Sequence, residues 1–168
     1  MRLFLAILPT PAMREALLDL QRQLRRQVES ADPVRPDNLH LTLAFLGETD
    51  RPEAASRAMR RIKTAPFELT LQGAGRFGDL HWAGLSASSP LLNLAADLGD
   101  ALRDEGFSLE KGRFKPHITL ARRVRSQTPV RLTPAPVTMT VQQIALMQST
   151  REQGKLIYRA IDTHRLTP

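Results

Sequence analysis

The chain has 168 residues, 42% of them hydrophobic, and a formal net charge of +7. This length and composition suit one compact domain or two small lobes around a shared core, and they exclude a disordered or fibrous chain. Cysteine is absent, which excludes a disulfide scaffold, thiol catalysis and cysteine-based zinc sites. The basic charge favours a polyanionic ligand such as RNA, although the arginine-rich usage of a GC-rich genome would produce the same charge.

The first predicted element is a buried strand at Leu3–Leu8. Arg2 and the apolar run give this segment a superficial likeness to a secretion signal. The run ends at Pro9 after about six residues, short of the roughly 7–15 that the apolar region of a signal needs. No other stretch approaches the length of a membrane span. We therefore expect a soluble, cytoplasmic monomer that does not associate with membranes.

The next predicted element is a helix from Ala12 to about Val28, where apolar residues recur at helical spacing after a Thr10-Pro11 cap. A turn-rich segment then leads into a predicted strand, Leu39–Leu46, which contains His40-Leu41-Thr42-Leu43-Ala44. Gly47 is expected to end this strand.

A second helix is predicted at Pro52–Ala65, and Pro66 should stop it. Phe67–Leu71 alternates between apolar and polar residues as a strand does. Three glycines should bend the chain before the next strand: Gly73, Gly75 and Gly78. That next strand is predicted at Leu80–Leu85.

The third predicted helix, Leu91–Glu105, follows a Ser88-Ser89-Pro90 cap, and Gly106 should end it. The chain then repeats its earlier motif as His117-Ile118-Thr119-Leu120-Ala121, again in a strand. A proline-rich loop is expected at Ser126–Pro136. The last predicted element is a hairpin of two strands, Val137–Met147 and Lys155–Asp162.

This order of elements contains an internal repeat. A strand, a proline-capped helix, a turn-rich approach and a His-x-Thr-Leu-Ala strand occur twice, with the histidines about 77 residues apart. The sequence therefore predicts an α+β fold built from duplicated β-α-β units, with antiparallel sheets around a central cleft and helices on the outside. We expect residues 1–168 to form one domain of two pseudo-symmetric lobes that share this cleft.

Strand geometry places the histidine and the threonine of each motif on one face, because side chains two residues apart point the same way. The aliphatic residues between them then point into the core. Two such strands would bring two imidazoles and two hydroxyls to one cleft: His40, Thr42, His117 and Thr119. A histidine pair can act as general acid and general base near neutral pH, and hydroxyls can donate to phosphate oxygens. A strained 2′,3′-cyclic phosphate would react at such a site without a metal ion or another cofactor.

The two motifs in their longer contexts, Asn38–Gly47 and Phe114–Arg122, resemble the paired signature of the 2H phosphoesterase superfamily. They are most similar to its RNA 2′,3′-cyclic phosphodiesterase branch, the LigT-like group also called 2′-5′ RNA ligases. The resemblance implies hydrolysis of RNA 2′,3′-cyclic phosphate ends to 2′-phosphomonoesters. It also implies that His40 is the proton donor, that His117 is the base, and that Thr42 and Thr119 bind the phosphate.

Several other residues have two interpretations. Arg122 could grip phosphate, but strict alternation puts it on the face opposite His117. Lys115 and Arg113 could contact the RNA backbone or lie on a solvated loop. Aromatic residues that could stack a base, or simply fill the core, are Trp82, Phe45 and Phe114. The remaining histidines, His81 and His164, have no matching context and are expected to be structural.

Two rival functions stay open at this level. The same chemistry run in reverse would join RNA ends through a 2′-5′ linkage, with a hydroxyl in place of water. Alternatively, the cleft could bind a nucleotide or RNA without turnover. Product analysis with a cyclic-phosphate substrate separates these readings from hydrolysis.

Overall fold

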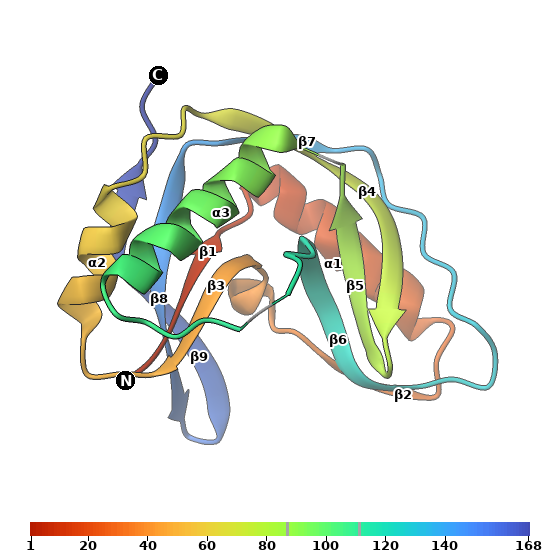
Figure 1. Cartoon of the computed structure of the whole chain (residues 1–168). Helices are drawn as coiled ribbons and strands as arrows, with labels where there is room; N and C mark the ends of the chain where they lie inside the picture. The colour runs from red at the N-terminus through yellow and green to blue at the C-terminus, as the bar shows by residue number, and fades with distance from the viewer. Residues whose placement is uncertain (87, 111) are drawn as a thin grey trace.

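The computed structural model describes residues 1–86, 88–110 and 112–168, whose strands and helices are shown in Figure 1. The strands are β1 (Arg2–Ile7), β2 (Ser30–Pro33), β3 (Leu41–Glu48), β4 (Phe67–Phe77), β5 (Leu80–Leu85), β6 (His117–Arg125), β7 (Thr138–Val141), β8 (Gln143–Glu152) and β9 (Lys155–Arg165). The helices are α1 (Pro11–Arg25), α2 (Pro52–Arg60) and α3 (Ser89–Asp104), with a short 3-10 turn at Pro36–Asn38.

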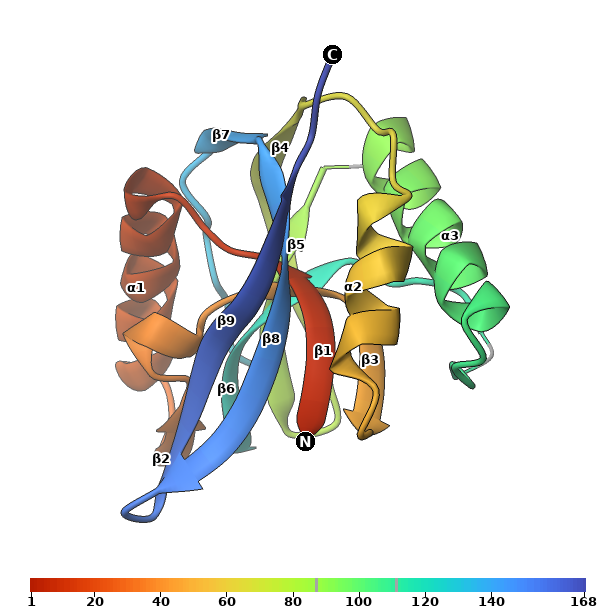
Figure 2. The ribbon, with the colours of Figure 1, turned by 90° about the vertical axis from the view of Figure 1, so that its left-hand side faces the viewer.

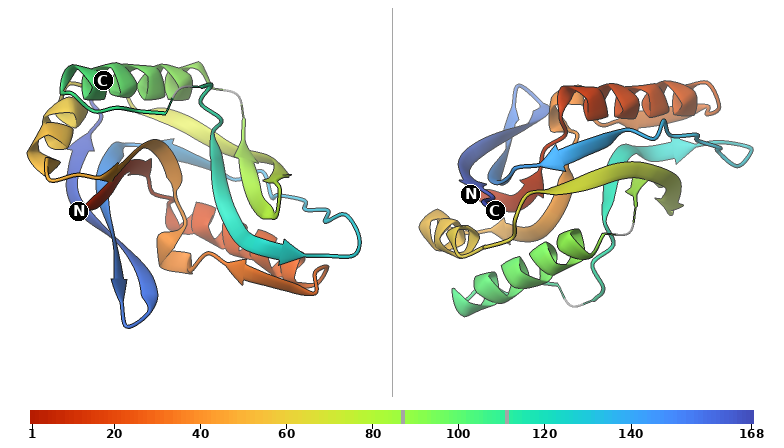
Figure 3. Two further views of the ribbon diagram at one scale, coloured as in Figure 1. Left: turned by 60° about the horizontal axis from the view of Figure 1, so that its bottom comes forward. Right: turned by 90° about the horizontal axis from the view of Figure 1, so that it is seen from above.

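The strands form one antiparallel sheet in the order β7-β4-β5-β6-β3-β1-β8-β9, and β2 pairs with the far end of β6. Its middle is weakly joined. β3 and β6 share the single registered pair Leu41–Ile118, whereas β8 and β9 pair from Gln143–Arg165 to Glu152–Lys155. The sheet therefore opens on either side of this contact, and it is curled rather than flat (Figure 3).

β1 lies in the interior of the sheet between β3 and β8, which explains its unbroken apolar sequence. Leu3, Leu5 and Ile7 belong to the main core, while Phe4 and Ala6 form a smaller cluster on the other face. Leu3–Ile7 is thus buried on both faces, as predicted, whereas Leu8 lies beyond the strand and is exposed.

Helices cover both sides of the strands, with α1 on one side and α2 and α3 on the other (Figure 2). Their starts follow the predicted caps. The Thr10 hydroxyl accepts a hydrogen bond from the backbone N–H of Met13 at 3.3 Å, and the Ser88 hydroxyl accepts one from Leu91 at 3.3 Å. The α+β class, the antiparallel sheet and the outer helices are as expected from the sequence.

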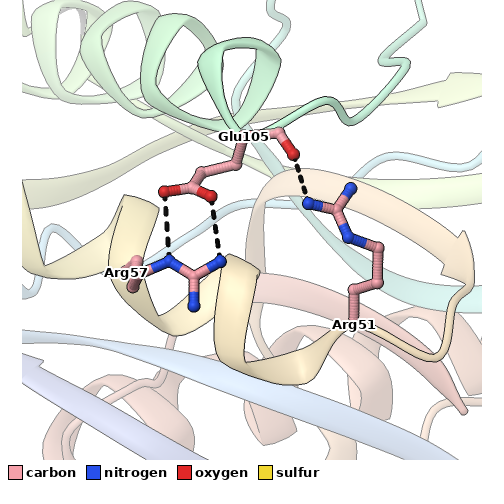
Figure 4. A network of polar contacts seen from close by, with 3 residues as sticks. All are labelled: Arg51, Arg57 and Glu105. Atoms are coloured by element: carbon pink, nitrogen blue, oxygen red, sulfur yellow. Dashed lines mark hydrogen bonds and ion pairs between the residues drawn. The ribbon is translucent and has the colours of Figure 1, made fainter.

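A polar network ties α2 to the end of α3 (Figure 4). The guanidinium of Arg57 donates to both carboxylate oxygens of Glu105, at 3.3 and 3.1 Å, and Arg51 donates to the Glu105 carbonyl at 2.6 Å. Gly106 follows in the left-handed region with φ 94°, and a Cβ there would lie 3.2 Å from the Arg51 guanidinium. The glycine therefore ends α3 as predicted and leaves room for this contact.

Some predicted boundaries were wrong. α2 ends at Arg60, not Ala65. The backbone N–H of Ile62 donates to the Met59 carbonyl, which makes a tight turn, and the Ile62 side chain is buried in the core. The first helix likewise ends at Arg25, before Val28. β4 does not stop at Leu71 but continues past its glycines to Phe77, since Gly75 pairs with Trp82 on β5.

The C-terminal region also differs from the prediction. Val137–Met147 is divided between two strands, because β7 pairs with β4 whereas β8 pairs with β1 and β9. β2 was not predicted at all. Its residues are polar and turn-rich, and its pairing with the arginine-rich end of β6 is a long-range contact without a local pattern.

Candidate active site

His40, Thr42, His117 and Thr119 line one open cleft of about 930 Å³. The cleft lies over the point where β3 and β6 diverge. The aliphatic residues that alternate with these four are buried, as predicted: Leu39, Leu41, Leu43, Ile118 and Leu120. The strand parity of the two motifs thus separates polar from core side chains as expected, and the sheet brings both motifs to the same place.

The single registered pair between β3 and β6 sets how the motifs face each other. Leu41 lies opposite Ile118 in antiparallel orientation. The two motifs therefore run in opposite directions past this pair, with a histidine and a threonine on either side of it. Of the hydroxyls in the two motifs, that of Thr42 lies 2.8 Å from Nε2 of His40.

Both imidazoles are held by the same backbone contact. Nδ1 of His40 lies 2.7 Å from the Asn38 carbonyl oxygen, and Nδ1 of His117 lies 2.6 Å from the Lys115 carbonyl oxygen. A carbonyl oxygen can only accept, so Nδ1 donates in both rings. In the neutral tautomer this leaves the lone pair on Nε2, and Nε2 of each histidine is the atom available for proton transfer.

His40 is the more enclosed of the pair. Its ring packs 4.8 Å from Phe4 and edge-on to Tyr158 at 5.3 Å between centroids. Burial lowers the pKa of His40 below its ordinary value of 6.5; the hydrogen bond to Asn38 opposes this, while the charges of Arg122 and His117 add to the lowering. Burial also raises the pKa of Tyr158.

Arg122 lines the cleft with the two motifs, although strict alternation placed it on the other face. The cause is a β-bulge. His81 of β5 pairs with Ala121 and Trp82 pairs with Thr119, so Leu120 has no partner on β5. Leu120 and Ala121 are consecutive and both fully buried. The extra residue reverses the parity beyond it and turns Arg122 to the side of His117 and Thr119.

The rest of the cleft wall carries more positive than negative charge. Arg2 and Arg151 join Arg122 on it, and the carboxylate there, Glu48, lies 3.3 Å from the amino group of Met1. The guanidinium of Arg2 also lies over the ring of Phe45 at 5.0 Å. This arrangement attracts an anionic ligand to the two histidines.

The other candidate residues lie around this cleft or away from it. Phe45 is on the cleft wall. Arg113 and Lys115 line adjacent grooves, whose other residues include His117, Phe114 and Trp82. Nε2 of His164 donates to the Ile62 carbonyl, 2.9 Å away, which fits the structural role expected for this histidine. His81 is buried on the far side of β5, in a different pocket.

Sequence reasoning missed several residues of the cleft. Phe4 and Tyr158 enclose His40, and Arg2 and Arg151 contribute charge, but β1 and the closing hairpin carry no motif that marks them. A long-range contact pattern would have been needed to find them. The side of β6 on which Arg122 lies also depends on the bulge, for which no sequence signal is visible.

No three His, Asp or Glu side chains among residues 1–86, 88–110 and 112–168 gather as a metal-binding group. No helix in the same ranges has the length and apolar character to cross a bilayer.

Comparison with known proteins gives consistent matches. The model of the 2′-5′ RNA ligase superfamily matches residues 9–153. An RNA 2′,3′-cyclic phosphodiesterase of Geobacillus stearothermophilus is 30% identical over 89% of this chain, which spans only 52% of that protein. One from Thermotoga maritima is 34% identical, with 73% of this chain and 70% of that protein covered. The crystal structure of E. coli LigT complexed with 3′-AMP superposes with a TM-score of 0.87 at 29% identity, covering 99% and 98% of the two chains.

Proposed function

The chain belongs to the 2′-5′ RNA ligase superfamily, and on this premise we propose that it hydrolyses the 2′,3′-cyclic phosphate ends of RNA to 2′-phosphomonoesters. The observation that carries the proposal is the meeting of His40, Thr42, His117 and Thr119 in one cleft with Arg122. Two imidazoles held through Nδ1 by backbone carbonyls, together with several hydrogen-bond donors, match the needs of phosphodiester hydrolysis.

In the proposed reaction, Nε2 of His117 takes a proton from water as the water oxygen attacks phosphorus. The bond from phosphorus to O3′ breaks, and Nε2 of His40 gives a proton to O3′, so that the 2′-phosphomonoester remains. These roles follow the family resemblance. The shared Nδ1 contacts are compatible with either direction, since both Nδ1 atoms donate to carbonyls and leave Nε2 as the atom that exchanges the proton.

The remaining polar groups of the cleft stabilise the phosphate. The hydroxyls of Thr42 and Thr119 donate to its non-bridging oxygens as charge develops there, and the Arg122 guanidinium adds a fixed positive charge. The strained ring exposes phosphorus to attack, and acid and base are both supplied by the chain. No step of this scheme requires a metal ion or another cofactor.

An RNA end is the proposed substrate because the cleft wall is basic and because relatives are named for this substrate. The LigT structure with 3′-AMP shows that a similar fold holds a nucleotide. We further propose that residues 1–168 work as one domain of two lobes, as a monomer in the cytoplasm.

Product analysis tests the function. The protein is incubated in EDTA with a dinucleotide that carries a 2′,3′-cyclic phosphate end. The products are separated by chromatography against 2′- and 3′-phosphate standards. The expected product is the 2′-phosphate alone. A 3′-phosphate product, or no turnover by the folded protein, would overturn the proposal. A longer RNA formed in the presence of a 5′-hydroxyl fragment would establish the joining reaction instead.

A further inference from the structure

A second groove, of about 740 Å³, adjoins the cleft. His117 is the residue that lines both. Its wall is formed by the β4–β5 hairpin, the start of α3 and the segment before β6. Among the side chains of this wall are three aromatic and two basic residues: Phe77, Trp82, Phe114, Arg113 and Lys115. The proposed hydrolysis uses none of them.

Phe77 is the central feature of this groove. It remains 42% exposed despite its large apolar side chain, and its ring meets His117 edge-on, with 5.1 Å between centroids. Its other neighbour is Trp82, at 5.3 Å. Packing inside the protein does not explain an aromatic ring held half in solvent at the edge of a proposed active site.

The support beneath Phe77 is built at a cost in stability. Trp82 lies across from Gly75, where a Cβ would come within 2.5 Å of the indole ring, so β4 needs a glycine at that position. Glycine weakens a strand interior. Within the described ranges, the buried indole N–H of Trp82 also has no hydrogen-bond partner. Both features favour a functional reason for the Phe77–Trp82 pair.

Cations surround the same rings. Nζ of Lys115 lies 5.9 Å from the centre of the Phe77 ring, and Arg113 lines the groove beside it. Exposed aromatic faces combined with neighbouring positive charges are the chemistry that binds single-stranded nucleic acid, with bases stacked on the rings and phosphates near the cations.

We propose that this groove binds the nucleoside that precedes the terminal, phosphate-bearing nucleotide, with its base stacked on Phe77 and its phosphate near Lys115. The preferred substrate is then an RNA end of at least two nucleotides rather than a cyclic mononucleotide. This inference rests on the proposed function, because it takes the terminal phosphate to lie between His40 and His117.

Kinetics on two substrates tests the groove. kcat/KM is measured for adenosine 2′,3′-cyclic phosphate and for the dinucleotide ApA with the same cyclic end. The wild-type protein should favour the dinucleotide by about 5- to 150-fold, the range that one stacked base contributes. Phe77→Ala should abolish this ratio, mainly through KM, and Phe77→Tyr should restore it. Ile161→Ala, at a comparably exposed apolar residue on β9, is the matched control and should keep the wild-type ratio.

The same experiment contains the contrary outcome. If Phe77→Ala lowers kcat/KM equally for both substrates, Phe77 acts on what the two substrates share, through His117 or the terminal nucleoside, and the groove does not bind the preceding nucleoside. An unchanged ratio overturns the inference as well. Lys115→Gln removes the charge but keeps the carbonyl that holds His117, and it should weaken dinucleotide binding more at low salt than at high salt.

A binding measurement separates failure of the groove from failure of the proposed function. Trp82 is the only tryptophan of the chain, so its fluorescence reports directly on the groove. ApA with a 2′-phosphate should change this fluorescence, and adenosine 2′-phosphate should do so much less. Binding with this signal but no turnover would support nucleoside binding in the groove and contradict the proposed phosphodiesterase activity. Turnover with neither the signal nor a dinucleotide preference would do the reverse.

Discussion

The Thr42 hydroxyl lies 2.8 Å from Nε2 of His40, on the atom proposed to exchange the proton. In the neutral ring this hydroxyl donates to the imidazole, and on substrate binding it is placed to turn to a phosphate oxygen. Thr42→Ala should lower kcat by about 10²–10³-fold, the scale for loss of one donor to developing charge. Thr42→Ser keeps the hydroxyl and should retain most activity. Equal losses in the two variants would instead point to a packing role for the threonine methyl group.

Replacement of either histidine should stop the reaction. His40→Gln and His117→Gln are each expected to lower kcat by at least about 10²–10⁴-fold, because each removes one proton-transfer group. The double variant should cost much less than the product of the two single losses, since acid and base act as a unit. Circular dichroism and thermal unfolding serve as the control for His40, which is largely enclosed. Substantial activity in either folded single variant would contradict the histidine-pair mechanism.

Arg122 and Arg123 offer a matched pair of neighbouring arginines. Arg122 is on the cleft wall, whereas Arg123 has a positive φ of 51° and donates to Asp32 at 2.7 Å. Arg122→Gln should raise KM and lower kcat/KM by about 10- to 100-fold, an estimate for a hydrogen bond from a charged donor to phosphate. Arg123→Gln removes the same charge from the protein but should change kcat/KM by less than about twofold, because an exposed ion pair contributes little. Equal effects would argue for net charge and against a specific contact.

The pH profile distinguishes the direction of proton transfer. The pKa of His40 lies below 6.5, chiefly because of burial. As the proton donor, His40 must be protonated in the free enzyme, so kcat/KM should fall as pH rises through that lowered pKa. As a base, His40 would give the opposite limb, with activity lost as pH falls. Kinetics between pH 4.5 and 9 on the dinucleotide with a cyclic phosphate end would measure both limbs, and the limb whose pKa matches an NMR titration of the His40 ring belongs to His40.

Arg122 also gives a check on that assignment. Its positive charge contributes to the lowering of the His40 pKa. Arg122→Gln should therefore move the His40 limb to higher pH, toward 6.5, whichever role the histidine has. A titration of the His40 ring by NMR would measure the same shift without substrate. No movement in either experiment would show that the guanidinium and the imidazole are not electrostatically coupled.

Much of the site was predictable because it depends on strand parity and on repetition. Alternation placed His40 and Thr42 on one face and Leu41 in the core, and the second motif did the same with His117 and Thr119. Local patterns of this kind need no knowledge of the rest of the chain. Capped helix starts were predictable for the same reason, since Thr10 and Ser88 make their contacts within three residues.

What the sequence could not show depends on contacts between distant segments. The bulge at Leu120 exists because of how β5 pairs with β6, and it alone decides which way Arg122 points. Tyr158 reaches His40 only because the closing hairpin pairs with β1. The same limit explains β2, whose partner lies some ninety residues further along the chain.

The contact between β3 and β6 bears on the order in which the site forms during synthesis. His40 is synthesised early and His117 late, and β1 is completed as an interior strand only when β8 arrives. A nascent chain that ends before β6 therefore carries only the first of the two His-x-Thr motifs. The proposed activity therefore depends on the late strands β6 and β8, because β6 brings the second motif and β8 completes the pairing of β1.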